Sequence, residues 1–261
     1  MAEIIAITNQ KGGVGKTTTC VNLAASLAAM KRRVLLVDMD PQGNATMGCG
    51  VDKRHIEAGS CEVLLGEASL ADTLVRVEGG FDLLPSNGDL TAAEVQLMRL
   101  GDGQRSLRRV LGEVASKYEF IFIDCPPSLN MLTINALTAA GGVIIPMQCE
   151  YYALEGLSAL LETVEQIRGS VNPELKIEGL LRTMYDGRNR LANEVAGQLL
   201  THFGKQVFNT IVPRNVRLAE APSHGQPVLH YDKSSLGARA YLALAGEMLR
   251  RRKVEPAVAD I

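Results

Sequence analysis

The chain has 261 residues, of which 46% are hydrophobic and 21% charged, and its formal net charge is −2. This length and composition predict one α/β domain over residues 1–261 that buries its core without a disulfide or a metal, and the charge excludes a uniformly basic, histone-like protein. The sequence has no apolar run near the ~18 residues of a membrane span and no basic secretory leader at its N-terminus, so we expect a cytoplasmic protein.

Short apolar runs alternate with helical patterns along the chain. The runs predict strands at 4–7, 34–37, 81–84, 120–123, 143–145, 177–181 and 207–212. The helical patterns cover 17–30, 89–99, 104–117, 128–139, 153–169, 190–203 and 234–251, with Ser128 and Ser234 as expected N-caps. This order predicts a mostly parallel twisted sheet with helices on both faces, a Rossmann-like fold that binds ligands at the carboxyl ends of its strands.

The segment from Asn9 to Thr18, NQKGGVGKTT, follows the first predicted strand and opens the first predicted helix. Glycines allow backbone N–H groups to wrap around phosphate oxygens, and a helix N-terminus adds its positive dipole end. This strand–loop–helix motif predicts the P-loop of a P-loop NTPase, in which Lys16 reaches the β- and γ-phosphates and the Thr17 hydroxyl is a Mg²⁺ ligand. The residues expected to hold the nucleotide here are Lys11, Gly12, Gly13, Val14, Gly15, Lys16, Thr17 and Thr18.

Three carboxylates follow predicted strands. Asp38 and Asp40 end the second strand at positions i and i+2, which point the same way. We expect Asp40 to orient or deprotonate the attacking water, and Asp38 to support the Mg²⁺ shell; two turn aspartates without chemistry are the alternative. Asp124 ends the strand at 120–123, as in a Walker B motif, and is expected to hold Mg²⁺ through water.

Five cysteines, Cys20, Cys49, Cys61, Cys125 and Cys149, form no CxxC pair. Their odd number and wide spacing argue against a disulfide scaffold, a zinc ribbon and a tightly spaced iron–sulfur motif. We expect reduced, buried side chains that behave as small hydrophobes. A cluster shared between two subunits stays open.

The C-terminal third is basic. Residues 182–253 hold 12 Lys and Arg against 5 Asp and Glu, a local net charge of +7, whereas the rest of the chain carries −9. The functional interpretation of this charge is a surface that binds the phosphates of DNA. The structural interpretation is that the cations lie near a helix C-terminus, where the helix dipole favours them. The candidate DNA contacts are Arg188, Arg190, Arg214, Arg217, Lys233, Arg250, Arg251, Arg252 and Lys253.

The phosphate loop departs from the pattern GxxxxGK[ST], because Gln10 replaces the first glycine and Lys11 is an additional lysine. With this loop, the segments VDMDPQGN (37–44), DCPPS (124–128), EYYALEG (150–156), TMYD (183–186) and VPRNVRLAEAPSHG (212–225) carry a resemblance over roughly residues 3–250. The chain resembles the short, chromosomal ParA/Soj partitioning ATPases, members of the deviant Walker A class that also contains MinD and the nitrogenase iron protein.

The resemblance implies an ATP-sandwich homodimer in which Lys11 reaches the partner subunit's nucleotide. It implies that Lys11, Lys16 and Asp40 are catalytic, with ATP and Mg²⁺ as cofactors. It also implies non-specific binding to double-stranded DNA, nucleoid association in the ATP state, and slow hydrolysis that a ParB/Spo0J-like centromere-binding partner stimulates. Pro213, Asn215 and Met184 would lie beside the adenine. The phosphate loop begins at residue 11, so no N-terminal helix-turn-helix for operator binding is expected.

Three other functions stay open. A MinD-like membrane-cycling ATPase of cell-division positioning would need an amphipathic C-terminal helix, although the apolar residues of the last predicted helix fit a core position. A carrier of electrons or a metal cluster would use Cys125 or Cys149. A passive ATP-sensing adaptor would bind the nucleotide without hydrolysis.

Overall fold

The computed structural model describes residues 2–254, with side chains up to residue 252, and contains an eight-stranded sheet in this part of the chain. The spatial order is β3-β4-β2-β5-β1-β6-β7-β8, and every pairing is parallel except that of β3 with β4. The strands are β1 (Glu3–Ile7), β2 (Val34–Asp38), β3 (Val75–Arg76), β4 (Asp82–Leu84), β5 (Phe120–Asp124), β6 (Gly142–Gln148), β7 (Lys176–Tyr185) and β8 (Val207–Pro213). The predicted fold class is confirmed.

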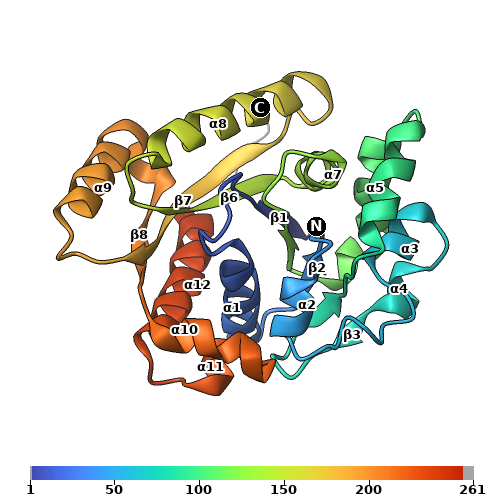
Figure 1. Ribbon diagram of the computed structural model, residues 1–261, viewed down its shortest axis with the longest axis horizontal. Coiled ribbons are helices and arrows are strands. Elements are labelled where there is room, and N and C mark those ends of the chain that lie inside the picture. Colours follow the sequence, from blue (N-terminus) through green and yellow to red (C-terminus); the bar gives the residue numbers. More distant parts are fainter. Residues whose placement is uncertain (1, 255–261) are drawn as a thin grey trace.

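Helices cover both faces of this sheet (Figure 1). The α-helices are α1 (Lys16–Ala29), α2 (Asn44–Gly48), α3 (Ser60–Leu65), α4 (Leu70–Thr73), α5 (Leu90–Arg99), α6 (Ser106–Val114), α7 (Met131–Ala139), α8 (Ala153–Ser170), α9 (Arg190–Phe203), α10 (Val216–Glu220), α11 (Val228–Tyr231) and α12 (Leu236–Val254). Short 3₁₀ turns occupy Gly103–Arg105, Ala115–Lys117, Gly204–Gln206 and Ala221–His224. No helix in the described residues has the length and apolar character needed to cross a membrane.

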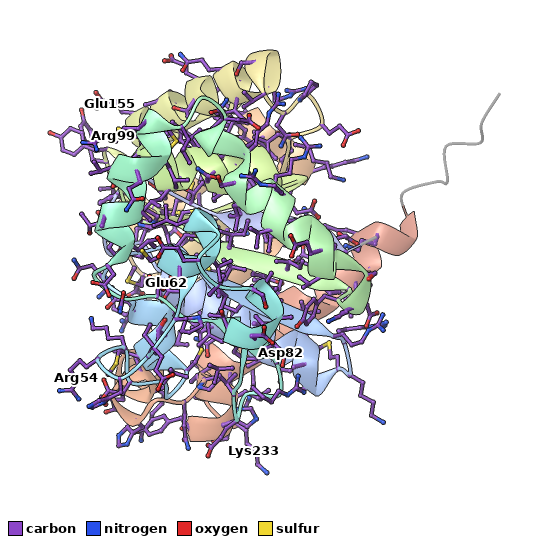
Figure 2. The ribbon with its side chains drawn as sticks, turned by 90° about the vertical axis from the view of Figure 1, so that its right-hand side faces the viewer. Arg54, Glu62, Asp82, Arg99, Glu155 and Lys233 are labelled. Atoms are coloured by element: carbon purple, nitrogen blue, oxygen red, sulfur yellow. The ribbon has the colours of Figure 1, made fainter. Side chains whose placement is uncertain are left out.

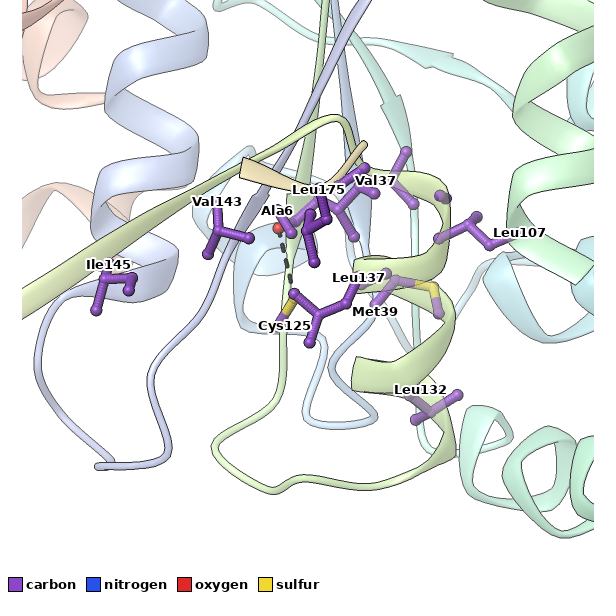
Figure 3. Close-up of a cluster of buried hydrophobic side chains, with 14 of the residues drawn as sticks. Ala6, Val37, Met39, Leu107, Cys125, Leu132, Leu137, Val143, Ile145 and Leu175 are labelled. Carbon is purple, nitrogen blue, oxygen red and sulfur yellow. Dashed lines mark hydrogen bonds between the residues drawn. The ribbon is translucent and has the colours of Figure 1, made fainter. Parts of the chain in front are cut away.

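Alternation along the central strands separates two cores. Ile5 and Ile7 of β1 pack with α1 and α12 on one face, whereas Ala6 between them packs toward α7 on the other. Successive strand residues point to opposite faces, so strands without polar interruptions are buried on both sides. Figure 3 shows the core on the α7 side of the sheet, where Cys125 lies among Ala6, Met39 and Leu137. All five cysteines are buried, which confirms that part of the prediction, and none forms a disulfide within the described residues.

Short elements account for most departures from the predicted pattern. β3 and the helices α2, α3, α4, α10 and α11 have six residues or fewer, too few for a periodicity to be recognised. The predicted cap Ser128 is wrong, because the Asn130 side chain accepts the hydrogen bond from Thr133 N and α7 starts at Met131. Ser234 is wrong by one position, since Ser235 Oγ accepts from Ala238 N.

The register brings the predicted site together. Ile7 of β1 pairs with Asp124 of β5, and Asp124 pairs with Asp38 of β2, so three adjacent parallel strands end at the same level. Because β5 lies between β1 and β2 in the sheet, the loops that leave β1 and β2 open beside Asp124. This carboxyl edge is where such sheets bind ligands.

Candidate nucleotide-binding site

A cleft of about 740 Å³ opens at this edge of the sheet. It runs from the loop after β1, past Asp40 and Pro127, to the segment that follows β8. The predicted site residues among those that line it are Gly12, Gly13, Gly15, Lys16, Thr17, Thr18, Asp40, Met184, Pro213, Arg214 and Asn215. The structure therefore gathers the proposed phosphate and adenine residues around one cavity large enough for a nucleotide.

The loop after β1 has the backbone of a phosphate cradle. Gly13 and Gly15 adopt φ values of 72° and 90°, which glycine reaches without strain. A Cβ added at Gly12 or Gly13 would meet no heavy atom within 4 Å, so the concave side of the loop is open. No side chain caps α1 and its first turn has no acidic residue, which leaves the amides of this helix end available to an anion.

Side chains from neighbouring strands hold this loop. Asn9 accepts a hydrogen bond from Lys11 N at 2.9 Å and donates to the carbonyl of Pro146 in β6 at 2.8 Å. The Thr183 hydroxyl of β7 donates to the Val14 carbonyl at 2.7 Å. Thr183 belongs to the TMYD segment, but its contact with the loop could not be predicted, because a threonine within a strand gives no local signal of a partner so distant in the chain.

The two lysines of the loop lie in different surroundings. Lys16 is 7% exposed, and its ammonium donates to the Lys11 carbonyl at 3.2 Å. Burial lowers the pKa of Lys16, against the opposing charges of Asp124 and Asp40. Lys11 lies at the exposed rim, where its ammonium pairs with Glu150 Oε2 at 2.5 Å. Lys16 is thus placed for a phosphate inside the cleft and Lys11 for a group outside it.

Asp124 is fully buried at the end of β5. The Cys20 thiol donates to its Oδ1 at 3.3 Å, whereas its Oδ2 is buried without a hydrogen-bond partner among the described residues. Burial, and after it the nearby Asp38 charge, raise the pKa of Asp124. A buried carboxylate oxygen without a donor fits a Mg²⁺ site, since Mg²⁺ takes oxygen ligands and needs only one or two from the protein.

Asp38 has different partners. Its Oδ2 accepts from the Thr46 amide at 2.8 Å and the Thr46 hydroxyl at 2.7 Å, and its Oδ1 accepts from Asp40 N at 3.1 Å. Each oxygen of Asp38 thus already accepts at least one hydrogen bond from the protein. The geometry therefore argues against the predicted metal role of Asp38 and makes its carboxylate a support of the loop that carries Asp40.

Asp40 is 6% exposed and lines the cleft. Its Oδ1 accepts from the Gln42 amide at 2.9 Å, and its Oδ2 accepts no hydrogen bond from residues 2–252. An Asp that bonds the amide two residues later closes a tight turn. One carboxylate oxygen is thus fixed by the backbone, and the other is left for a ligand or water.

The far end of the cleft contains the predicted adenine residues. Asn215 Oδ1 is buried and has no hydrogen-bond partner in the described part of the chain. Met184, at φ 48°, is one of two residues other than glycine with positive φ in the described chain, and the Gln148 amide donates to its sulfur at 3.4 Å. A strained backbone beside an unsatisfied amide oxygen is typical of a ligand site.

The candidate DNA residues do not form a single surface of free cations. Arg251 lies over the Phe208 ring and pairs with Glu247, and Arg252 lies over Phe120 and pairs with Glu3, so both are structural rather than exposed, contrary to expectation. Exposed side chains remain at Arg188, Arg190, Arg214, Arg217, Lys233 and Arg250. Figure 2 places Lys233 at the end of the molecule opposite Glu155. The Lys253 side chain lies outside the described part.

Three of these exposed arginines have acidic partners. Arg188 pairs with Asp186, Arg190 with Glu194, and Arg217 with both Glu220 and Asp232. Ion pairs in water contribute little, so these guanidinium groups can exchange partners with a phosphate.

The parallel sheet and the loop between β1 and α1 define a P-loop nucleotide-binding protein. Residues 2–177 match the family described as AAA domain. The sporulation initiation inhibitor protein Soj of Bacillus subtilis is 51% identical over 250 residues, which cover 95% of this chain and 98% of that one. The chromosome partitioning protein ParA of Caulobacter vibrioides is 48% identical over 260 residues, 98% of this chain and 97% of that one.

A solved structure extends the likeness to the fold. Cobyrinic acid a,c-diamide synthase from Mycobacterium smegmatis, with a bound ATP analogue and magnesium, superposes with a TM-score of 0.86 at 38% identity and covers 97% of each chain. The chain belongs to the ParA/Soj family of chromosome-partitioning ATPases. This result confirms the resemblance drawn from its motifs.

Proposed function

We propose that this protein is an ATP-dependent DNA-partitioning ATPase. It converts ATP and water into ADP and phosphate slowly on its own, and a ParB-like partner accelerates this hydrolysis. The proposal rests on the orphaned Oδ2 of Asp124, which is buried at the end of β5, and on the cleft at the same edge of the sheet, which Lys16 and Asp40 line. These are the three kinds of group that phosphoryl transfer needs: a cation for the phosphates, a carboxylate for Mg²⁺, and a carboxylate for water.

Each residue has a defined task in this mechanism. The amides of the loop and the Lys16 ammonium bind the phosphates, and Thr17 and Asp124 would hold Mg²⁺, which neutralises charge that develops on the phosphoryl oxygens. Asp40 Oδ2 orients the attacking water and accepts its proton. Asn215 Oδ1 accepts a hydrogen bond from the adenine amino group, while Pro213 and Met184 contact the ring.

The dimer is proposed from the rim of the same edge. Lys11 and Glu150 are about half exposed, and Tyr151 and Tyr152, which follow Glu150, are 73% and 68% exposed. Leu129, between β5 and α7, is 44% exposed. A second copy that covers this edge buries these apolar side chains. Lys11 of each copy then lies close to the nucleotide that the other copy binds. The exposed basic residues of each copy then act together on double-stranded DNA, so ATP controls DNA affinity through avidity, and the ATP form associates with the nucleoid.

Asp40→Ala tests the proposal, because it removes the hydrolytic carboxylate but leaves Lys16, Thr17 and Asp124. We expect ATP affinity within about threefold of the wild-type value and hydrolysis about 10²–10⁴-fold slower. Single-turnover hydrolysis and a calorimetric ATP titration measure the two quantities. A variant that hydrolyses ATP at the wild-type rate would show that Asp40 is structural.

The MinD-like alternative needs a C-terminal helix that can leave the protein. Tyr241, Leu244 and Met248 of α12 are at most 1% exposed. The helix α12 itself lies beside α1 (Figure 1). This packing favours DNA over a membrane surface as the partner.

A further inference from the structure

Thr46 and Ser86 form a buried network behind Asp40. Thr46, in α2, donates from its amide and hydroxyl to Asp38, and its hydroxyl oxygen accepts from the Ser86 amide at 2.9 Å. Thr46 and Ser86 are 0% and 1% exposed, and neither is among the described residues that line the cleft. Their hydrogen bonds therefore act on the loop between β2 and α2 rather than on a bound nucleotide.

Ser86 also contacts the main chain of Asp40. Its hydroxyl donates to the Asp40 carbonyl at 3.0 Å, and the same carbonyl accepts from the Gly43 amide at 2.8 Å. Both lone pairs of this carbonyl are thus engaged, and Asp40 N is bound to Asp38. The peptide groups on both sides of the Asp40 side chain are fixed by these contacts.

Gly43 shows independently how closely the loop packs on this support. Its φ is 57°, and a Cβ at this position would lie 2.6 Å from the Ser86 carbonyl oxygen. The loop therefore rests directly on the backbone of the segment after β4. Because β4 lies on the far side of β2 from β5, the position of Asp40 is set by an element remote from the P-loop.

We propose that Ser86 and Thr46 are positioning residues for Asp40, which hold its Oδ2 where it can orient the attacking water. This inference rests on the proposed function. Displacing a catalytic group by about 1 Å can reduce a rate by about 10²-fold, whereas phosphate binding by the P-loop does not depend on this support. Loss of either hydroxyl is therefore expected to lower turnover and spare ATP affinity.

The test compares the full-length wild-type protein with Ser86→Ala and Thr46→Val, using Mg·ATP and non-specific plasmid DNA. We expect kcat to fall about tenfold in both variants, with KM and the calorimetric ATP affinity within about threefold. Thr46→Ser keeps the hydroxyl and should restore kcat to within about threefold of wild type. The matched control is Thr163→Val, which removes a buried hydroxyl that donates to the Ala159 carbonyl in α8 and should leave kcat unchanged.

A double-mutant cycle separates positioning from general loss of structure. If Ser86 acts through Asp40, Ser86→Ala should slow hydrolysis less than twofold further in the Asp40→Ala background. Wild-type kcat in Ser86→Ala and Thr46→Val, an ATP affinity that falls as much as kcat, or a further tenfold loss in the double variant would each overturn the inference.

Two other results also decide between positioning and a failure of the proposed function. If Ser86→Ala does not fold, the contrast between Thr46→Val and Thr46→Ser decides. If Asp40→Ala alone hydrolyses ATP at the wild-type rate, the role of Asp40 in the proposed function is wrong. The positioning roles of Ser86 and Thr46 are then wrong as well.

Discussion

Asp38 and Asp124 are register neighbours on β2 and β5, yet their surroundings assign them different tasks. Asp38 accepts three hydrogen bonds from Asp40 and Thr46, whereas Asp124 keeps a buried oxygen without a donor. A buried polar atom without a partner costs free energy, and a cation beside Asp124 would remove that cost. Two identical residue types that end neighbouring strands are thus separated by contacts that the sequence does not reveal.

The variant Lys16→Ala tests the contribution of a single residue to the phosphate site. The variant loses the buried ammonium beside the loop, and a hydrogen bond to a charged group contributes about 2–3 kcal/mol. We therefore expect ATP affinity to fall about 30- to 100-fold in a calorimetric titration. Lys117→Ala, an exposed lysine outside the residues that line the cleft, is the control and should bind like wild type. Equal affinity in Lys16→Ala would remove the P-loop assignment.

At the scale of elements, the long strands and helices could be predicted from periodicity, and the P-loop from its glycines and lysines. Because parallel strands end at one edge, the sequence also predicted that Lys16, Asp40 and Asp124 meet. The contacts of Thr46, Ser86 and Thr183 could not be predicted, since each joins segments far apart in the chain. Nor could the inward packing of Arg251 and Arg252, because a basic run after apolar residues also fits an exposed helix end.

Glu247 joins α12 to the edge strand β8. It is 5% exposed and accepts hydrogen bonds from the Asn209 amide, the Thr210 amide and hydroxyl, and Arg251. Burial alone would raise the pKa of Glu247, but these donors outweigh it and lower the pKa below its ordinary value. The side chain of Glu247 thus holds the C-terminal helix on β8 more strongly when its carboxyl group is ionised.

Glu247→Gln should lower the free energy of unfolding by about 2 kcal/mol at pH 7. Because the folded-state pKa is depressed, this contribution is present above the unfolded-state pKa, about 4.3, and is lost as the pH falls through the folded-state value. The difference in melting temperature between wild type and variant should therefore shrink as the pH is lowered from 7 toward 3. Glu194→Gln, in an exposed ion pair, is the control. A pH-independent difference would contradict the account.

For the whole molecule, the proposed dimer depends on the rim of the cleft. Lys11→Ala should leave ATP affinity of the monomer within about threefold, because the Lys11 ammonium points to Glu150 at the rim and not into the cleft. ATP-dependent dimerisation should be lost, since a lysine that acts across the interface matters only when two subunits meet. Light scattering with Mg·ATP measures the mass. A dimer as stable as that of wild type would refute the proposed role of Lys11 in the partner's site.

In the proposed function, ATP switches this protein into a form that binds DNA of any sequence. The most direct test is the affinity of the full-length protein for two unrelated DNA duplexes, measured with Mg·ATP, Mg·ADP and no nucleotide over a range of salt. We predict tight binding to both duplexes with ATP alone, and an affinity whose logarithm falls linearly with log[salt], by about 0.9 for each phosphate neutralised. Equal affinity with ADP and ATP, or strong preference for one duplex, would contradict the claim.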